Sequence, residues 1–288
     1  MVAERLKNID LNENEVVVSF DVSSLYTNVP VQEAIEHCTN LLFSGKYQKP
    51  PVDRDTFQKL LTVCTCDVIM STNLGYYRQV DGLAMGSPPA PLIANGWLSQ
   101  FDNVIQDTAK MYFRYMDDII REINHDQVQP KLDEINHLHP SLKFTMEEEN
   151  NCSIPFLDMK ILRTNNKLSS TWYTKPTDTG LTMNFHVLAP MKYKRSLVIV
   201  LVHRIYRCCS SWQLFHESME KAKMLLKRNQ YPTSFYEPII KDTLAKLFTK
   251  NESDESEEKE EEDRKLVFVE YRGRVLRHPV KLFSHYEK

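Results

Sequence analysis

A pair of adjacent carboxylates, Asp117 and Asp118, constrains the fold of this chain more than any other feature. An apolar run over residues 111–115 precedes the pair, and a second run over 119–123 follows it. This pattern predicts a β-hairpin whose turn, residues 116–118, places both carboxylates at the rim of a sheet. Like charges so close together repel each other and need a cation, and oxygen ligands at one rim suit Mg²⁺. A solvated turn explains the pair equally well, because Asp favours turns for its own backbone hydrogen bonds.

A third carboxylate, Asp21, follows the short β-branched run over residues 16–20. That run predicts a buried strand. A charged residue at the end of a buried strand costs free energy unless it has a partner or a function. Asp21 therefore either joins a metal site with the carboxylate pair or caps the turn that follows the strand.

Residues 81–91 form a compact loop that contains two glycines and three prolines. Glycine lets the backbone approach a ligand closely, and a predicted helix over 92–107 follows the loop. A loop ahead of a helix N-terminus suits phosphate or nucleotide binding. A purely structural turn is the alternative interpretation.

The remaining patterns up to residue 175 predict short helices and strands joined by turns. Helices are expected over 30–43, from 53 or 55 to 66, and over 126–138. A hairpin is expected over 68–80, and strands over 142–146, 154–162 and 168–174. The fold class that follows is α+β, with a mostly antiparallel sheet.

From residue 176 the pattern becomes helical and basic. Helices are expected over about 192–207, 212–228 and 233–248. The basic residues of the first are Lys192, Lys194, Arg195, Arg204 and Arg207. A basic helical face suits binding to a nucleic-acid backbone. Ordinary solvent-exposed helix faces are the alternative explanation of the same residues.

Charge and cysteine content limit the class of protein. Residues 252–263 hold nine acidic residues and one lysine, which leaves a net charge of +5 on the rest of a chain whose total is −3. A mildly basic body permits a phosphate-rich partner without requiring one. The six cysteines lack zinc-site spacing, there is no signal peptide, and the longest apolar run is too short for a membrane span. We expect an intracellular protein in a reducing compartment, without membrane contact.

The order of these features resembles the palm of reverse transcriptases, whose motifs A to E run in the same sequence. Asp21 corresponds to motif A, the loop over 81–91 to motif B, the Asp117–Asp118 hairpin to motif C, Lys143 to motif D and residues 156–158 to motif E. The amino-acid sequences of several stretches resemble those of Penelope-like retroelements, and the resemblance covers about residues 13–275. These stretches are 19–30, 77–88, 139–147, 154–158, 173–177 and 194–204.

The resemblance implies RNA-directed DNA synthesis. The expected partners are an RNA template, a DNA primer and dNTPs, and the expected cofactor is Mg²⁺, with Mn²⁺ as the alternative ion. Asp21 and Asp117 would hold the metals, with Asp118 beside them and the backbone carbonyl of Val22 in contact with one. Metals bound together can bridge the attacking and leaving oxygens of an in-line displacement.

The resemblance also assigns residues around the incoming nucleotide. Tyr26 resembles the aromatic residue that excludes a ribose 2′-hydroxyl. Lys143 is the candidate proton donor to pyrophosphate. The motif B residues that would contact the nucleotide are Met85, Gly86, Ser87 and Pro88.

On the primer side, Phe156 and Leu157 resemble the primer grip. The basic residues that would lie along the backbone of the duplex are Lys194, Arg195 and Arg204.

The predicted layout is a palm over residues 1–175, a helical thumb over 176–250, an acidic disordered linker over 251–264 and a short tail over 265–288. Two hypotheses remain open: an active reverse transcriptase, and a catalytically inactive remnant that at most binds nucleic acid. The remnant hypothesis rests on the fingers of the family, which we do not find in the sequence. The C-terminal GIY-YIG endonuclease that is usual in the family is also not found. Nuclear residence is implied by the family only.

Overall fold

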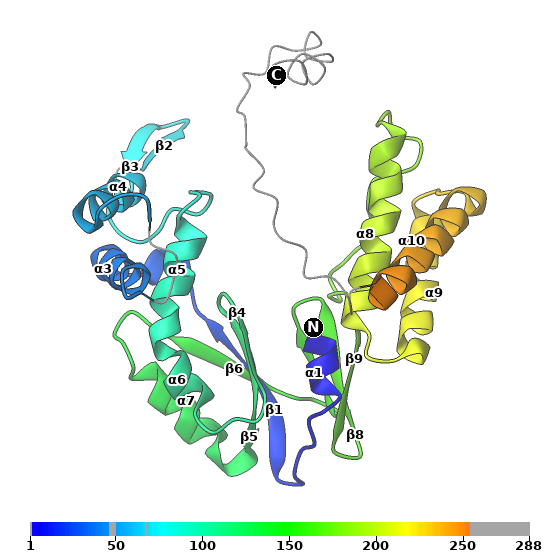
Figure 1. The fold of residues 1–288 in the computed structure, drawn as a ribbon, viewed down its shortest axis with the longest axis horizontal. Coiled ribbons are helices and arrows are strands. Elements are labelled where there is room, and N and C mark those ends of the chain that lie inside the picture. The colour runs from blue at the N-terminus through cyan, green and yellow to red at the C-terminus, as the bar shows by residue number, and fades with distance from the viewer. Residues whose placement is uncertain (1, 46–49, 67, 254–288) are drawn as a thin grey trace. The chain divides into compact units, whose positions relative to one another are not determined.

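The computed structural model describes residues 2–45, 50–66 and 68–253 (Figure 1). Residues 1–243 form one compact unit, to which the following description applies, and residues 244–288 are grouped in a second. The predicted tail and all but the first residues of the predicted acidic linker lie outside the described residues.

The elements before the carboxylate pair follow the sequence pattern closely. They are α1 Val2–Leu6, β1 Glu15–Val22, α2 Leu25–Asn28, α3 Val31–Leu42, α4 Arg54–Cys66, β2 Ile69–Thr72, β3 Gly75–Arg78, α5 Ala90–Leu98, the 3₁₀ turn η1 Ser99–Phe101 and α6 Asp102–Gln106. The predicted helix over 92–107 is thus interrupted by a 3₁₀ turn. The predicted helix over 53–66 is confirmed, and the Asp53 side chain caps it by accepting a hydrogen bond from the Thr56 amide at 2.9 Å.

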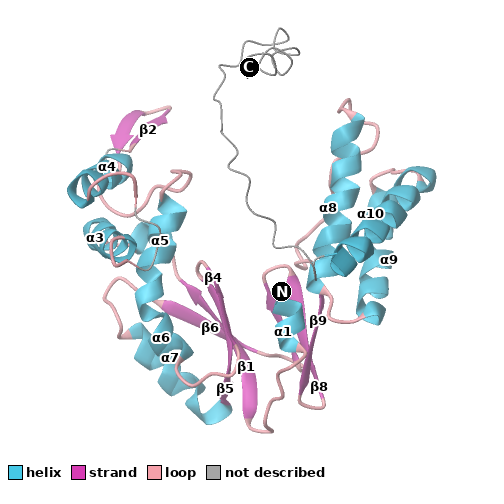
Figure 2. Ribbon diagram, viewed as in Figure 1, coloured by secondary structure: helices cyan, strands magenta, loops and turns pink. Residues whose placement is uncertain are grey.

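The later elements alternate strands with one short helix and end in three long helices (Figure 2). They are β4 Tyr112–Tyr115, β5 Asp118–Asn124, η2 His125–Gln127, α7 Val128–Asn136, β6 Phe144–Glu148, β7 Ser153–Phe156, β8 Met159–Thr164, β9 Lys167–Trp172, α8 Met191–Cys208, α9 Trp212–Arg228 and α10 Thr233–Ser253. No helix among the described residues is long and apolar enough to cross a membrane.

All strand pairs within the described residues are antiparallel, as predicted. A four-stranded sheet has the order β4-β5-β1-β6, a three-stranded sheet has the order β7-β8-β9, and β2 pairs only with β3. The strand predicted over 154–162 is wrong, because the chain reverses at Leu157 with a left-handed φ of 53° and forms the β7–β8 hairpin.

Alternate residues of β1 enter two separate cores. Val18, Phe20 and Val22 pack in the first core with α3 and α5, where Trp97 is fully buried. Val17 enters the second core, which lies against α1 and the three-stranded sheet. Asp21 is an even number of residues from Val17, so it lies on the face of β1 that is turned toward the three-stranded sheet.

Candidate active site

The β4–β5 hairpin carries the carboxylate pair, as the sequence pattern predicts. Tyr115 pairs with Asp118, so the connecting turn is Met116 and Asp117. Met116 is left-handed, with φ 57°, a conformation that costs on the order of 1–2 kcal/mol in a residue with a side chain. Asp117 therefore lies in a tight turn at the rim of the sheet, and Asp118 is the first residue of β5.

Arg114 holds this turn against the helices. Its guanidinium binds both oxygens of Asp102 on α6, at 2.6 and 2.8 Å, and contacts the Asn95 side chain on α5. It also donates to the Met116 carbonyl at 3.2 Å. A bidentate pair with a half-buried carboxylate is well suited to fixing the strained turn that carries Asp117.

Strand pairing brings the third carboxylate to the same place. Asp21 lies directly opposite Asp118 in the β1–β5 register. Partial burial and then the charges of Asp117 and Glu147 raise the pKa of Asp21. Partial burial and then Asp117 and Asp21 raise the pKa of Asp118, against a lowering by Lys175. The carboxylates therefore act on one another as a cluster of negative charge.

A cavity of about 530 Å³ opens on this cluster. Asp21 and Asp118 line one side of it, together with Thr145 and Glu147 of β6. The tip of the β7–β8 hairpin and the segment 173–177 line the other side. The site is thus a hollow between the rim of the four-stranded sheet and the three-stranded sheet.

The donor set at this hollow fits a hard divalent cation. Among the described residues no three His, Cys, Asp or Glu side chains already lie in metal-ligating positions. Mg²⁺, however, is usually bound by one or two carboxylates, with waters and substrate phosphates as its other ligands. Two cross-strand carboxylates whose pKa values are both raised, with a third in the adjacent turn that contributes to both shifts, meet that requirement.

Replacing Asp21 with asparagine should raise the melting temperature of the metal-free protein at pH 7. A carboxyl whose folded pKa is raised destabilises the fold once it ionises, so stability falls as pH rises from the unfolded value near 3.8 through the raised folded value. The gain at pH 7 should stay below about 1 kcal/mol, because the group is exposed, and should vanish below pH ~4. Thermal unfolding in EDTA across this pH range measures it. The control is Asp126→Asn, whose side chain is 99% exposed; an equal gain in the control would show that net charge alone is responsible.

The candidate nucleotide side of the site is built where the motif A turn meets the motif B loop. Tyr26 lies in α2 and is partly buried against the first core. Its carbonyl accepts a hydrogen bond from the Leu83 amide at 2.7 Å. Gly82, with φ 73°, packs so tightly here that a Cβ would lie 2.7–2.9 Å from the backbone of Tyr26 and Thr27. The contact fixes the loop to the turn through backbone atoms.

Replacing Gly82 with alanine should destabilise the fold by about 2–4 kcal/mol. The new Cβ would add a left-handed penalty of about 1 kcal/mol to an overpacking cost of about 1–3 kcal/mol. Chemical denaturation measures the loss. Gly45→Ala is the matched control, because Gly45 has φ 85° and no atom of the described residues lies within 4 Å of the added Cβ. Equal losses at the two positions would contradict the close packing at Gly82.

The rest of the motif B loop is open. Gly86 has φ 95°, and a Cβ there would meet no atom within 4 Å in the part of the chain that the structure describes. Met85, Gly86 and Pro88 are exposed, Ser87 is half-buried, and α5 begins directly afterwards at Ala90. None of these residues lines the carboxylate cavity.

Lys143, Phe156 and Leu157 lie around the same rim. Lys143 is exposed and precedes β6, and its carbonyl accepts a hydrogen bond from the Ser23 amide at 2.8 Å, just beyond the end of β1. Phe156 is buried in the second core. Leu157 is exposed at the hairpin tip, and both line the carboxylate cavity.

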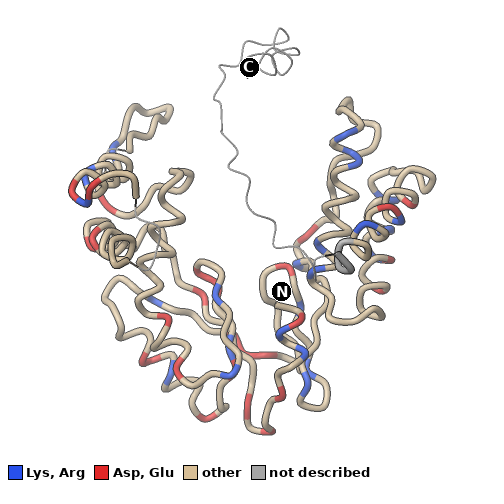
Figure 3. The backbone as a smooth tube through the Cα atoms, viewed as in Figure 1, with Lys and Arg blue, Asp and Glu red and all other residues tan. Residues whose placement is uncertain are grey.

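The predicted backbone contacts on α8 need correction. Lys194 is only 7% exposed, and its ammonium lies over the Phe185 ring at 5.1 Å, so it packs inward. Arg195 is exposed, and Arg204 forms an ion pair with Asp158 at 3.3 Å. The positions Lys192, Ser196, Val200 and Arg204 are all exposed and are spaced to form one stripe. Figure 3 shows the basic residues along α8 and α9 in blue.

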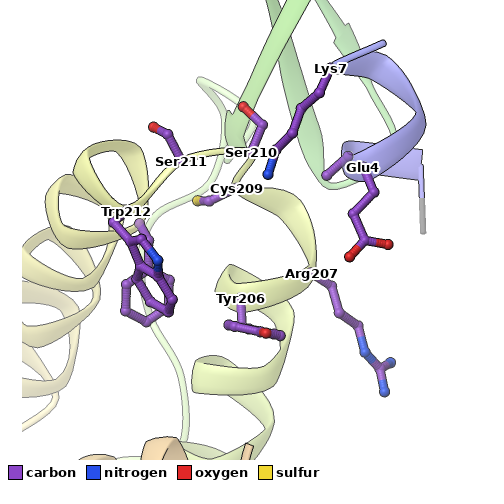
Figure 4. Close-up of a pocket in the computed structure, with 10 residues that line it drawn as sticks. Glu4, Lys7, Tyr206, Arg207, Cys209, Ser210, Ser211 and Trp212 are labelled. Atoms are coloured by element: carbon purple, nitrogen blue, oxygen red, sulfur yellow. The ribbon is translucent and has the colours of Figure 1, made fainter. Parts of the chain in front are cut away.

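A second cavity lies apart from the carboxylates (Figure 4). It has a volume of about 220 Å³ and is lined by α1 and the α8–α9 junction, including Lys7, Arg207 and Trp212. It shares no lining residue with the carboxylate cavity, and Glu4 is the single acid that lines it. It therefore lacks the paired acids on which the candidate site rests.

Comparison with known proteins assigns the family. A family model described as reverse transcriptase (RNA-dependent DNA polymerase) matches residues 3–151, which is just over half of the chain. The chain belongs to the reverse transcriptase family. This match spans Asp21, the motif B loop and the Asp117–Asp118 hairpin of the reverse transcriptase domain. A second family model, described as animal helix-turn-helix domain, matches residues 181–241, from the approach to α8 into α10.

Several solved structures are similar to this reverse transcriptase chain at low identity. A Candida albicans telomerase in complex with a telomeric RNA fragment has a TM-score of 0.49 and 14% identity, over 82% of this chain and 41% of that one. An apo telomerase from Candida tropicalis has a TM-score of 0.44 and 12% identity, over 84% and 47%. The Sicinivirus RNA-dependent RNA polymerase has a TM-score of 0.45 and 12% identity, over 82% and 52%. The chain spans about half or less of each of these proteins. No curated protein matches the sequence.

Three residues of the site were not assigned from the sequence. Glu147 adds negative charge beside Asp21, and Tyr173 and Lys175 line the far wall of the carboxylate cavity. All three residues lie within stretches that resemble the family, 139–147 and 173–177. The sequence of these stretches does not indicate which side chains lie next to them in the fold.

Proposed function

We propose that this chain is the RNA-directed DNA polymerase of a Penelope-like retroelement, with a palm over residues 1–175 and a thumb over 176–250. The observation that carries the proposal is the β1–β5 register, which puts Asp21 opposite Asp118 beside the turn of Asp117. Membership of the reverse transcriptase family supports the reaction class, and the amino-acid sequence of residues 19–30 supports the Penelope-like subtype. Nuclear residence belongs to the same proposal.

In the proposed reaction, the primer 3′-oxygen attacks the α-phosphorus of a dNTP. A new phosphorus–oxygen bond forms, the bond to the pyrophosphate oxygen breaks so that pyrophosphate leaves, and the proton of the 3′-hydroxyl passes to solvent water. Asp21, Asp117 and Asp118, with the carbonyl of Val22, would hold Mg²⁺, and Mn²⁺ is the alternative ion. The bound ion would supply Lewis acidity, which lowers the pKa of the hydroxyl and neutralises charge on the phosphate oxygens. The carboxylates contribute the charge that keeps this site selective for a hard cation.

The nucleotide would occupy the side of the site formed by the motif A turn and the motif B loop. Tyr26 would lie under the sugar and exclude a 2′-hydroxyl, and its backbone contact with Leu83 would hold it there. Gly86 would let the backbone approach the nucleotide, with Met85, Ser87 and Pro88 beside it. Lys143 would donate the proton that the leaving pyrophosphate takes up.

The template–primer duplex would lie along the hairpin tip of Phe156 and Leu157 and the exposed stripe of α8. Lys192 and Arg204 belong to that stripe, and Arg195 lies beside it as a further candidate contact. Lys194 is left out of the proposed contacts because it is buried. A basic helix next to the palm suits the phosphates of the duplex, whose binding should weaken with salt.

Primer extension on an RNA template tests the proposal. The full chain is incubated with a labelled DNA primer, dNTPs and Mg²⁺ or Mn²⁺, and products are sized on a denaturing gel. Extension that follows the template sequence is the expected result. Tight binding of the template–primer with no incorporation under either metal would reject polymerase activity in favour of a protein that only binds nucleic acid.

A further inference from the structure

A third cavity adjoins the carboxylate cavity and extends toward the helical segment. It has a volume of about 340 Å³ and is lined by Asp158 and Arg204. It shares with the carboxylate cavity the residues Leu157, Tyr173, Lys175 and Thr177. The two cavities are therefore neighbours along the β7–β8 turn and the segment after β9. Asp21, Asp118 and Glu147 line one end, and Arg204 lines the other end beside Asp158 and Asp178.

The segment that separates the two cavities is fixed in place. The Tyr173 amide donates to the Asp158 carbonyl at 2.8 Å, which ties the segment to the β7–β8 turn. The Asp178 amide donates to the Lys175 carbonyl at 2.9 Å, and Pro176 restricts the backbone of Lys175 to extended conformations. Lys175 is thus an exposed cation on a constrained backbone.

Lys175 lies close to the carboxylates without being neutralised by them. It lines the same cavity as Asp21 and Asp118, and its charge lowers the pKa of Asp118. No carboxylate of the described residues lies within ion-pair distance of its ammonium. Arg204 forms only an exposed pair with Asp158, and such pairs contribute at most about 1 kcal/mol. Both cations can therefore bind a phosphate with little loss of existing ion-pair energy.

We propose that Lys175 binds the phosphodiester group next to the 3′ end of the primer strand, so that the strand lies across both cavities with its 3′-oxygen at the acids. This inference rests on the proposed function. In it, Arg204 binds a phosphate further along the same strand, and Leu157 and Tyr173 form the apolar wall between the two contacts.

The primer fits Lys175 better than the triphosphate of the incoming nucleotide does. Neither Tyr26 nor any of residues 85–88 lines either of the two cavities. The residues proposed to contact the nucleotide therefore share neither of these two cavities with Lys175. A strand whose reacting oxygen is at Asp21 and Asp118, and whose phosphates continue past Leu157, passes Lys175 first and Arg204 next.

The test compares Lys175→Ala, Lys175→Arg and Lys241→Ala in the full chain. Lys241→Ala removes one exposed charge on α10, outside both cavities. Fluorescence anisotropy with a labelled DNA primer on an RNA template, over a series of KCl concentrations, gives the affinity and its salt dependence. Lys175→Ala should weaken binding about tenfold and reduce the slope of log affinity against log salt by about one. Lys175→Arg should restore most of the affinity, and Lys241→Ala should match the wild type.

The kinetics of primer extension provide a second, independent measurement. The KM for template–primer should rise about as much as the dissociation constant, while kcat and the KM for dNTP change little. An unchanged affinity and salt slope in Lys175→Ala would overturn the inference. A higher KM for dNTP with unchanged primer affinity would also overturn it, by assigning Lys175 to the triphosphate. If the wild type makes no product, the proposed polymerase function fails, whereas the anisotropy result still decides the role of Lys175 in binding.

Discussion

Replacing Asp117 with asparagine should lower single-nucleotide incorporation at least ~10³-fold while the protein stays folded. Asparagine keeps the size of the side chain and its place in the β4–β5 turn but removes the charge that a divalent cation needs. Lewis-acid stabilisation of the reacting phosphate contributes several kcal/mol, and about 4 kcal/mol corresponds to ~10³ in rate. Incorporation by wild type and variant, titrated with Mg²⁺ under single-turnover conditions, measures the loss.

Two further measurements separate this loss from unfolding or failed binding. The affinity for template–primer should be nearly unchanged in Asp117→Asn, and Mg²⁺ should raise the melting temperature of the wild type but not of the variant. Asp126→Asn, which removes an exposed acid outside the site, should retain full activity. A variant at Asp117 with activity within tenfold of the wild type would show that this carboxylate does not hold the catalytic ion.

Replacing Glu122 with alanine should destabilise the fold by about 3–5 kcal/mol, a large part of the total stability of a typical domain. Glu122 is 4% exposed in β5, and its carboxylate accepts the backbone N–H groups of Lys110 and Met111 just before β4. Alanine would leave two N–H donors without an acceptor, one of them on the fully buried Met111. Urea denaturation monitored by circular dichroism gives the change in the free energy of unfolding.

The isosteric variant Glu122→Gln should cost less, because its amide oxygen still accepts one of the two N–H groups. Glu148→Ala, at an exposed acid of the same sheet, should cost less than about 0.5 kcal/mol. Since the two backbone contacts begin the strand that leads to Asp117, Glu122→Ala should also weaken activity below its unfolding midpoint. A loss at Glu122 no larger than at Glu148 would contradict the role of the buried carboxylate.

The elements that local pattern controls were predicted well. The apolar runs around the Asp117–Asp118 pair are confirmed as β4 and β5, and the run over 16–20 lies within β1. The basic helix 212–228 is confirmed as α9, with the Ser211 hydroxyl accepting from the Leu214 amide at 3.3 Å as its cap. In each case the signal lies in neighbouring residues: alternation, periodicity or a capping side chain.

The predictions that were wrong concern residues whose conformation or burial depends on contacts with distant parts of the chain. The stretch 154–162 has the composition of one strand, yet it turns at Leu157 because the packing of β7 and β8 in the second core compensates a left-handed residue. Lysine is usually found at the surface, yet the position of Lys194 on α8 turns its side chain inward onto the Phe185 ring. A helical wheel of α8 would have shown that Lys194 is off the stripe of Lys192 and Arg204.

The sequence by itself determined which chemical groups this protein has and the local elements that carry them: an acid pair in a hairpin, an acid near the end of a strand, and a glycine-rich loop before a helix. Only the tertiary structure decided which of these groups meet. β1 lies between β5 and β6, and this order, set by burying the two faces of the sheet, puts Asp21 opposite Asp118 and Glu147 nearby. The segment after β9, in the three-stranded sheet, brings Lys175 to the lining of two cavities. Such pairings join residues far apart in the chain, and no local pattern specifies them.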